Sequence, residues 1–171
     1  MKNLIIAILM VVSLGVNAQG KVKWLTFEEA IEKSIKNPKP IIIDIYTDWC
    51  GWCKKMDNTT YKNEVIVKYI NEHYYPVKLN GEEKRDIVFQ GRTFTYKPNG
   101  RRGYHELAAA IMNGKLSYPS TAFLNKEKQL LQNVPGYMHE SKFEKVIAFF
   151  NHENYKKSSW QDFEKDFKSS M

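Results

Sequence analysis

The 171-residue chain contains two cysteines, Cys50 and Cys53, and they stand in a Cys-x-x-Cys arrangement. Such a pair can be half of a zinc site, a structural disulfide or a redox-active dithiol. Zinc takes about four ligands, and none of the four histidines is paired with another at ligand spacing, so we expect no metal. A structural bridge across so short a loop gains little chain entropy. The redox interpretation is therefore favoured over the other two.

This redox interpretation has a physical basis if a helix begins at Cys50. The first thiol then lies against unpaired backbone N–H groups and the positive end of the helix dipole, which favour the thiolate. We expect Cys50 to be the exposed attacking sulfur and Cys53, one turn further in, to be the buried resolving sulfur. Gly51 has no side chain to obstruct a substrate. Trp49 and Trp52 offer apolar contact surface on either side, although ordinary packing explains Trp49 equally well.

Hydrophobic patterning predicts the elements that position these cysteines. Ile41 to Tyr46 is a β-branched run bounded by prolines, which is typical of a buried central strand, and the cysteines follow it directly. A capping box of Thr26 and Glu29 predicts a helix over 26–36. We further predict helices over 63–73, 104–112 and 158–168, and one from a Ser141/Glu144 capping box to about 152. Strands are predicted over 75–79, 122–124 and 130–134. Between them we expect a hairpin over 87–96 with its turn at 90–92, and a loop at 98–100. This order requires one parallel and one antiparallel strand pair, so we expect an α/β sandwich around a small mixed sheet.

The first 18 residues have the pattern of a secretory signal peptide. Lys2 supplies a positive start, Leu4–Val12 is an unbroken apolar run, and small residues lead to a cleavage point after Ala18. An uncleaved anchor is the alternative, but the run is shorter than the roughly 20 residues of a membrane span. We expect an exported protein, periplasmic or secreted, that begins at Gln19 and has no membrane association after cleavage. Disulfides persist in such compartments.

The composition is that of a globular protein, with 43% hydrophobic and 26% charged residues. Residues 19–171 are long enough for one domain that needs no disulfide staples. The net charge of +7 is spread along the chain without a run of five like charges, so we expect no nucleic-acid partner. The largest local excess is over 82–119, with seven basic against four acidic residues.

Three segments resemble the thioredoxin superfamily. Residues 41–54, IIIDIYTDWCGWCK, are similar to its active-site strand and loop, and share a D-W-C-x-x-C-K-x-M signature with exported members such as the C-terminal domain of the transmembrane thiol–disulfide interchange reductases. Residues 77–80, VKLN, resemble the family's third strand, and residues 118–121, YPST, resemble the segment that carries its cis-proline. The resemblance covers residues 24–150. It implies a thioredoxin-like three-layer sandwich, here with an insert over about 82–117 before the cis-proline and an extra C-terminal helix.

The resemblance also implies roles for individual residues. Asp44 is similar to the buried acid that assists proton transfer at the resolving thiol, and burial in an apolar strand would raise the pKa of its carboxyl. A hydrogen-bonded acid at the strand end is the alternative. Lys78 is similar to the ammonium partner of that acid, with a solvated strand residue as the alternative. Pro119 in a cis peptide would leave the backbone of Tyr118 free to pair with an extended substrate.

The family therefore implies an exported thiol–disulfide oxidoreductase that acts on protein disulfides or thiols through a mixed disulfide on Cys50. A second redox protein would donate or accept its electrons, and we expect no cofactor beyond the Cys50–Cys53 disulfide. The D-W-C signature favours a reductase over an isomerase or oxidase. Trp52 stands where the family's reductants usually carry proline, which leaves the direction of electron flow open.

Two other functions fit the same residues. One is a binding or assembly module that keeps the fold without turnover, and the other is a metal carrier that uses the two cysteines. The insert over 82–117 contains four arginines. We expect it near the active-site rim, where it either selects partners through basic contacts or is a solvated elaboration.

Overall fold

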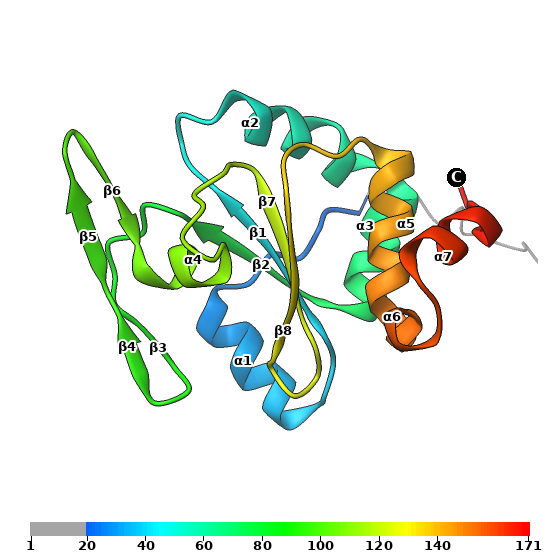
Figure 1. The fold of residues 1–171 in the computed structure, drawn as a ribbon, viewed down its shortest axis with the longest axis horizontal. Coiled ribbons are helices and arrows are strands. Elements are labelled where there is room, and N and C mark those ends of the chain that lie inside the picture. The colour runs from blue at the N-terminus through cyan, green and yellow to red at the C-terminus, as the bar shows by residue number, and fades with distance from the viewer. Residues whose placement is uncertain (1–19) are drawn as a thin grey trace, which may run out of the picture.

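A four-stranded sheet forms the centre of the computed structural model, which describes residues 20–171 (Figure 1). The expected signal peptide, residues 1–18, lies outside the described residues. The strand order is β2-β1-β7-β8; β1 pairs with β2 in parallel and with β7 antiparallel, and β7 pairs with β8 antiparallel. The strands are β1 (Ile41–Tyr46), β2 (Tyr75–Asn80), β7 (Ser120–Leu124) and β8 (Leu130–Pro135). The small mixed sheet and the central place of β1 confirm the predicted α/β sandwich.

Helices cover both faces of this sheet (Figure 1). One face packs against α1 (Phe27–Lys36) and α4 (Glu106–Ile111), and the other against α2 (Gly51–Asn58), α3 (Glu64–His73) and α5 (Glu140–Phe150). Alternation along β1 assigns its side chains to these two layers, because successive residues of a strand point to opposite faces. Ile43 belongs to the core under α1 and Ile42 to the core under α2. Asp44, two residues after Ile42, therefore points to the α2 face.

Two hairpins and α4 occupy the segment between β2 and β7. The first hairpin pairs β3 (Ile87–Phe89) with β4 (Arg92–Phe94), as predicted. The second pairs β5 (Tyr96–Asn99) with β6 (Arg102–His105), so the loop predicted at 98–100 is instead the end of a strand and its turn. Pro98 is tolerated in β5 because this ribbon has only two strands, and a proline without an N–H fits an edge.

The helix predicted from 104 begins later, at Glu106. His105 is the last residue of β6, and its Nδ1 accepts a hydrogen bond from the backbone N–H of Leu107 at 3.3 Å. The histidine side chain thus takes the N-cap role that ends the strand and starts α4. The helix ends before Asn113 and Gly114, both with positive φ, as the sequence predicts.

The predicted Ser141/Glu144 capping box is wrong. The N-cap of α5 is His139, and the Ser141 hydroxyl contacts the Nδ1 of that histidine at 2.9 Å. The Glu144 carboxylate is buried and accepts hydrogen bonds from the Ser169 hydroxyl and the Ser170 backbone N–H. A contact with the C-terminal tail has replaced the local cap, and such a long-range partner is not visible in the helix sequence itself.

The C-terminal segment is helical but more broken than the predicted helix over 158–168. Its last helix begins after the N-cap Ser159 and ends before Phe167, which has an extended backbone. The remaining short helices are η1 (Thr60–Lys62), η2 (Asn151–Glu153), α6 (Asn154–Lys157) and α7 (Trp160–Asp166). Within residues 20–171, none of the helices is both long and apolar enough to cross a membrane.

Candidate active site

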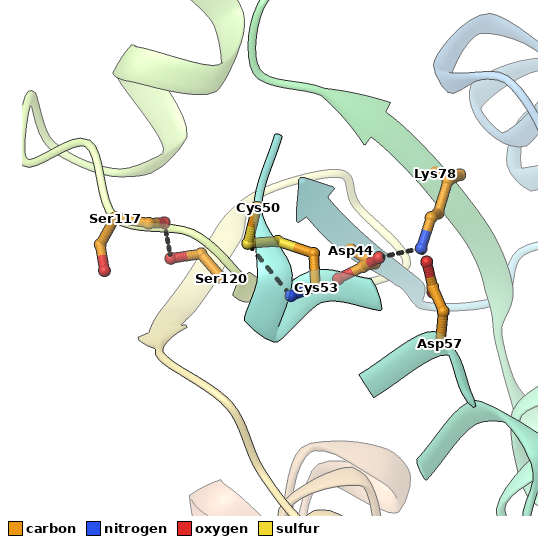
Figure 2. Close-up of a disulfide and its surroundings, with 7 residues drawn as sticks. All are labelled: Asp44, Cys50, Cys53, Asp57, Lys78, Ser117 and Ser120. Atoms are coloured by element: carbon orange, nitrogen blue, oxygen red, sulfur yellow. Dashed lines mark hydrogen bonds and ion pairs between the residues drawn. A yellow bond between two sulfur atoms is a disulfide. The ribbon is translucent and has the colours of Figure 1, made fainter. Parts of the chain in front are cut away.

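A disulfide between Cys50 and Cys53 lies at the end of β1, where the strand turns into α2 (Figure 2). The Cys50 backbone N–H donates to the Thr47 carbonyl at 3.1 Å, which closes this turn. Cys50 is the N-cap of α2, and its Sγ accepts a hydrogen bond from the Cys53 backbone N–H at 3.0 Å. The prediction of a helix that begins at Cys50 is therefore confirmed. Gly51 is the first residue of α2, and a Cβ added there would meet no atom within 4 Å.

The expected contrast between an exposed and a buried sulfur is wrong for this disulfide form. Cys50 is only 5% exposed and Cys53 is 2% exposed. The Cys50 sulfur is bonded to Cys53 and turned toward the first N–H groups of α2, so it is held against the helix rather than projecting from it.

A buried carboxylate and an ammonium lie together beneath the disulfide. Asp44 and Lys78 are direct partners in the parallel register of β1 and β2, and Lys78 Nζ lies 2.5 Å from Asp44 Oδ2. The same ammonium contacts the carboxylate of Asp57, which extends from α2. Figure 2 shows Asp44 between the disulfide and Lys78, with Asp57 on the far side of the ammonium. The side chains of Asp44, Lys78 and Asp57 are 2%, 20% and 38% exposed, so the three charges lead from the interior toward solvent.

Burial and charge act in opposite directions on this cluster. Burial raises the pKa of Asp44 above its usual 3.8, and the attraction of Lys78 only partly offsets this effect. For Lys78, burial alone lowers the pKa, but the two carboxylates outweigh it and leave the pKa above its ordinary value. Asp44 Oδ2 contacts Lys78, and an interaction with the Tyr61 hydroxyl is a smaller influence that lowers the pKa of Asp44. The arrangement provides a buried carboxyl whose raised pKa makes it a better proton acceptor than an exposed carboxylate.

Sequence reasoning did not identify Asp57 or the aromatic rings around Lys78. The ammonium lies 5.1 Å, 4.9 Å and 5.5 Å from the ring centroids of Trp24, Tyr46 and Tyr61. Asp57 had a local signal, because it follows Cys53 by four residues and therefore lies on the same side of α2. The three rings come from separate segments, so only the folded chain brings them together.

The loop before β7 completes the site. The Tyr118–Pro119 peptide bond is cis, as the resemblance implied. The Ser120 hydroxyl donates to the Ser117 carbonyl at 2.8 Å (Figure 2), and the Gly136 N–H donates to the Pro119 carbonyl at 2.7 Å. These bonds hold both ends of the loop. Within the described residues, the backbone of Tyr118 makes no hydrogen bond to another backbone group.

Trp49 is held by three segments that are distant in sequence. Trp49 is 50% exposed. Its indole Nε1–H donates a hydrogen bond to Glu82 Oε1 at 3.1 Å. The Arg102 guanidinium lies 4.2 Å from a Trp49 ring centroid, and the Tyr118 ring meets it edge to face at 5.9 Å. Two of these partners, Glu82 and Arg102, come from the segment expected at the active-site rim.

Trp52 contacts a lysine of its own helix and a tyrosine that is distant in sequence. It is 57% exposed, lies 4.9 Å from the Lys55 ammonium on the same helix, and lies 5.5 Å from the Tyr137 ring. The two tryptophans therefore form separate aromatic surfaces on the two sides of the cysteines. Over residues 20–171, no three His, Cys, Asp or Glu side chains are grouped so that they could hold a metal ion.

A central strand that leads into a helix capped by a Cys-x-x-Cys disulfide, together with a cis-proline before the next strand of the sheet, defines a thioredoxin-fold protein. A family model described as "Thioredox_DsbH: Protein of unknown function, DUF255" matches residues 12–171, and the chain belongs to this family.

Relatives and solved structures are consistent with this assignment. An "Uncharacterized protein B0495.5" of Caenorhabditis elegans is 27% identical over 89 residues, which are 52% of this chain and only 12% of that protein. The "Disulfide bond reductase DsbH" of Chlamydia pneumoniae is 28% identical over 68 residues, 39% of this chain and 41% of that protein. A solved structure titled "DsbH Oxidoreductase" has a TM-score of 0.54 at 17% identity, covering 86% of this chain and 91% of the other. This last likeness shows the fold alone.

Proposed function

We propose that this protein is an exported thiol–disulfide oxidoreductase that reduces disulfides of protein substrates through Cys50 and Cys53. The observation that carries the proposal is the Asp44–Lys78 pair buried beneath a disulfide that caps α2. A charged pair in this place has no stabilising purpose that apolar residues would not serve as well, whereas a proton acceptor there serves thiol chemistry. The name of the Chlamydia pneumoniae relative supports the reducing direction.

The reaction begins from the reduced pair. The Cys53 N–H that contacts the Cys50 sulfur donates to the Cys50 thiolate, and the N-terminus of α2 favours its negative charge. This thiolate attacks one sulfur of the client disulfide, and the other client sulfur leaves as a thiolate. Cys53 then gives its proton to Asp44 and attacks Cys50, which releases the second client thiolate and forms the Cys50–Cys53 disulfide. Two electrons pass to the client, and a second redox protein must restore the dithiol.

Insulin reduction by dithiothreitol, followed as turbidity, tests the activity. The wild type should accelerate the reaction, and Cys50→Ala should lower the rate to that of dithiothreitol alone, because no mixed disulfide can form. Circular dichroism of the variant serves as the folding control. Equal rates for the two proteins would overturn the enzyme and favour a binding or assembly module without turnover.

Two further experiments test the direction and the export. Cys53→Ser should leave clients disulfide-linked to Cys50, because the resolving thiol is absent. Recovered clients whose cysteines are otherwise reduced in the wild-type cell support a reductase, and wrongly paired clients support an isomerase. Sequencing of the mature protein should place its N-terminus at Gln19, and an N-terminus at Met1 would contradict the signal peptide.

A further inference from the structure

An open cleft of about 320 Å³ is lined by Trp49, the residue before Cys50 in the chain, although neither cysteine lines it. Trp49 and Tyr118 line it, and these residues directly precede Cys50 and Pro119 in the chain. Its opposite wall is the β5–β6 hairpin, which contributes Asn99, Arg102 and Tyr104 among others. A client segment that reaches Cys50 across Trp49 could therefore extend into this cleft.

The aromatic side of the cleft is fixed before any client binds. A Cβ added at Gly81 would come within 2.4 Å of the Tyr118 ring, so the ring packs directly on the backbone after β2. Tyr118 in turn meets the edge of Trp49, whose indole N–H is bonded to Glu82. Contacts from three segments thus orient the indole, and a preorganised surface loses little entropy on binding.

Arg102 is the unusual residue of this cleft. Its guanidinium lies over the face of Trp49, and among the described residues it forms no ion pair with a carboxylate. Arg85, in the same segment, contacts both Glu28 and Glu83. Stacking uses the flat face of a guanidinium and leaves its in-plane N–H groups available to donate. Arg102 is therefore stacked on Trp49 without an ion-pair partner among the described residues, although Glu82 lines the same cleft.

We propose that this cleft binds an aspartate or glutamate side chain that neighbours the client's disulfide cysteine, with Arg102 as its partner. The inference rests on the proposed function and names the substrate class of the same site. Glu82 is the opposing charge in the cleft, but it bonds the N–H edge of the indole, whereas Arg102 covers the face. A carboxylate can thus approach Arg102 from the hairpin side. The basic excess of residues 82–119 has the matching sign.

Mixed-disulfide formation with synthetic peptides tests this inference. Each peptide carries one cysteine as a mixed disulfide with thionitrobenzoate, and both neighbours of that cysteine are Asp, Asn or Lys. In the reduced Cys53→Ser protein, the Cys50 thiolate attacks the peptide sulfur and the coloured thionitrobenzoate anion leaves. Each rate is divided by the rate of the same peptide with free mercaptoethanol, which removes differences in intrinsic reactivity. The Asp peptide should react about fivefold faster than the Asn peptide, and 0.5 M salt should suppress most of this preference.

Substitutions at two neighbouring arginines provide the decisive comparison. Arg102→Gln should abolish the preference and Arg102→Glu should reverse it in favour of the Lys peptide. Arg101→Gln removes the same charge from the adjacent exposed residue, which does not line the cleft, and should retain the preference. Thermal unfolding confirms that each variant is folded. A preference that survives in Arg102→Gln, that is equally lost in Arg101→Gln, or that is absent from the parent would overturn the inference.

The same assay separates this failure from failure of the proposed function. If no peptide reacts faster with the Cys53→Ser protein than with a Cys50→Ala/Cys53→Ser background, Cys50 is not an attacking thiol and the oxidoreductase itself is overturned. If all three peptides react at the same elevated rate, the oxidoreductase stands and only the carboxylate preference is overturned.

Discussion

The two sides of the disulfide reverse the usual distribution of residues in a globular protein. On the inner side, three charged groups lie together, and Asp44 is almost completely buried. On the outer side, Trp49 and Trp52 are about half exposed. Charged residues are ordinarily outside, and an exposed indole is one of the larger apolar surfaces that a protein can present to water. Both departures occur within a few residues of the cysteines, which marks this end of the sheet as functional.

The two sides are also held by different means. Strand register fixes the inner pair, because Asp44 and Lys78 are neighbours across β1 and β2. Side chains from the hairpin segment hold the outer side, through Glu82 and Arg102 on Trp49. The proposed proton transfer would therefore depend on the sheet, and the proposed recognition would depend on a connection that can change without altering the sheet.

Asp44→Asn should produce the largest effect, on the inner side. The variant lacks the carboxyl proposed to accept the proton of Cys53, so the step that resolves the mixed disulfide should slow by about a hundredfold. Rapid-mixing measurement of client-thiol release from a preformed mixed disulfide gives this rate. Formation of the mixed disulfide by Cys50 should change much less, because that step does not need the Cys53 proton.

Asp48→Asn is the matched control for this experiment. Asp48 is exposed beside the same loop, and its carboxylate accepts a hydrogen bond from the Asn80 side-chain amide at 3.5 Å. Its variant should resolve the mixed disulfide within about twofold of the wild-type rate. Equal slowing in both variants would show that general negative charge, rather than the buried acid, matters.

The stability of Asp44→Asn relative to the wild type should depend on pH in a defined direction. Because the folded pKa of Asp44 is raised, the native state holds a proton above pH 3.8 that the unfolded chain has already released. The free energy of unfolding therefore falls as pH rises from 3.8 through the folded pKa. Asp44→Asn removes this loss, while Lys78 keeps Asp57 as its partner. The difference in unfolding free energy between Asp44→Asn and the wild type should therefore shift in favour of the variant as pH rises from 4 to 8.

Urea unfolding of both proteins across this pH range measures the difference. The Asp48→Asn protein again serves as the control and should follow the wild type. A difference between wild type and Asp44→Asn that is constant with pH would contradict the raised pKa.

Alanine substitutions at two glycines near the cysteines should differ in their effect on stability. Gly81→Ala places a Cβ within 2.4 Å of the tip of the Tyr118 ring, which must swing away from Trp49. We expect a loss of about 1 kcal/mol in urea unfolding and a change in tryptophan fluorescence. Gly51→Ala, at the start of α2, meets nothing and should be neutral or slightly stabilising. Equal effects of the two substitutions would show that Tyr118 is not packed against Gly81.

The sequence predicts most of the sheet and its flanking helices, because these depend on local patterns. The apolar run Ile41–Tyr46, the capping box at Thr26 and the cysteines at the start of α2 are all found as predicted. The failures have a common cause. Glu144 binds the C-terminal tail instead of its own helix end, and the loop at 98–100 is shaped by pairing with β6. In both, a partner distant in sequence replaces the local one.

The same distinction applies to the candidate site. The Cys50–Cys53 disulfide, the cis Pro119 and the contact of Asp44 with Lys78 lie in segments that resemble a known family. Asp57 and the stacking of Arg102 on Trp49 depend on how α2 and the second hairpin pack against the sheet. Residue types alone did not specify those contacts.

Asp57→Asn should give the smallest effect and shows how far the inner cluster extends toward solvent. The negative charge of Asp57 raises the pKa of Asp44, and both carboxylates contact the Lys78 ammonium. Without it, the pKa of Asp44 should fall, so the pH midpoint of the resolving step should move to lower pH. The rate at neutral pH should change by only about two- to threefold, because the charge lost is partly exposed.

The pH profile of the resolving rate, measured on the preformed mixed disulfide, distinguishes this role from a structural one. A merely destabilised protein would lose rate at all pH values with an unchanged midpoint. Asp48→Asn should leave both the midpoint and the rate close to wild type. A midpoint that stays in place or moves to higher pH in Asp57→Asn would show that Asp57 does not influence the titration of Asp44. The shared Lys78 ammonium would then not couple the two carboxylates.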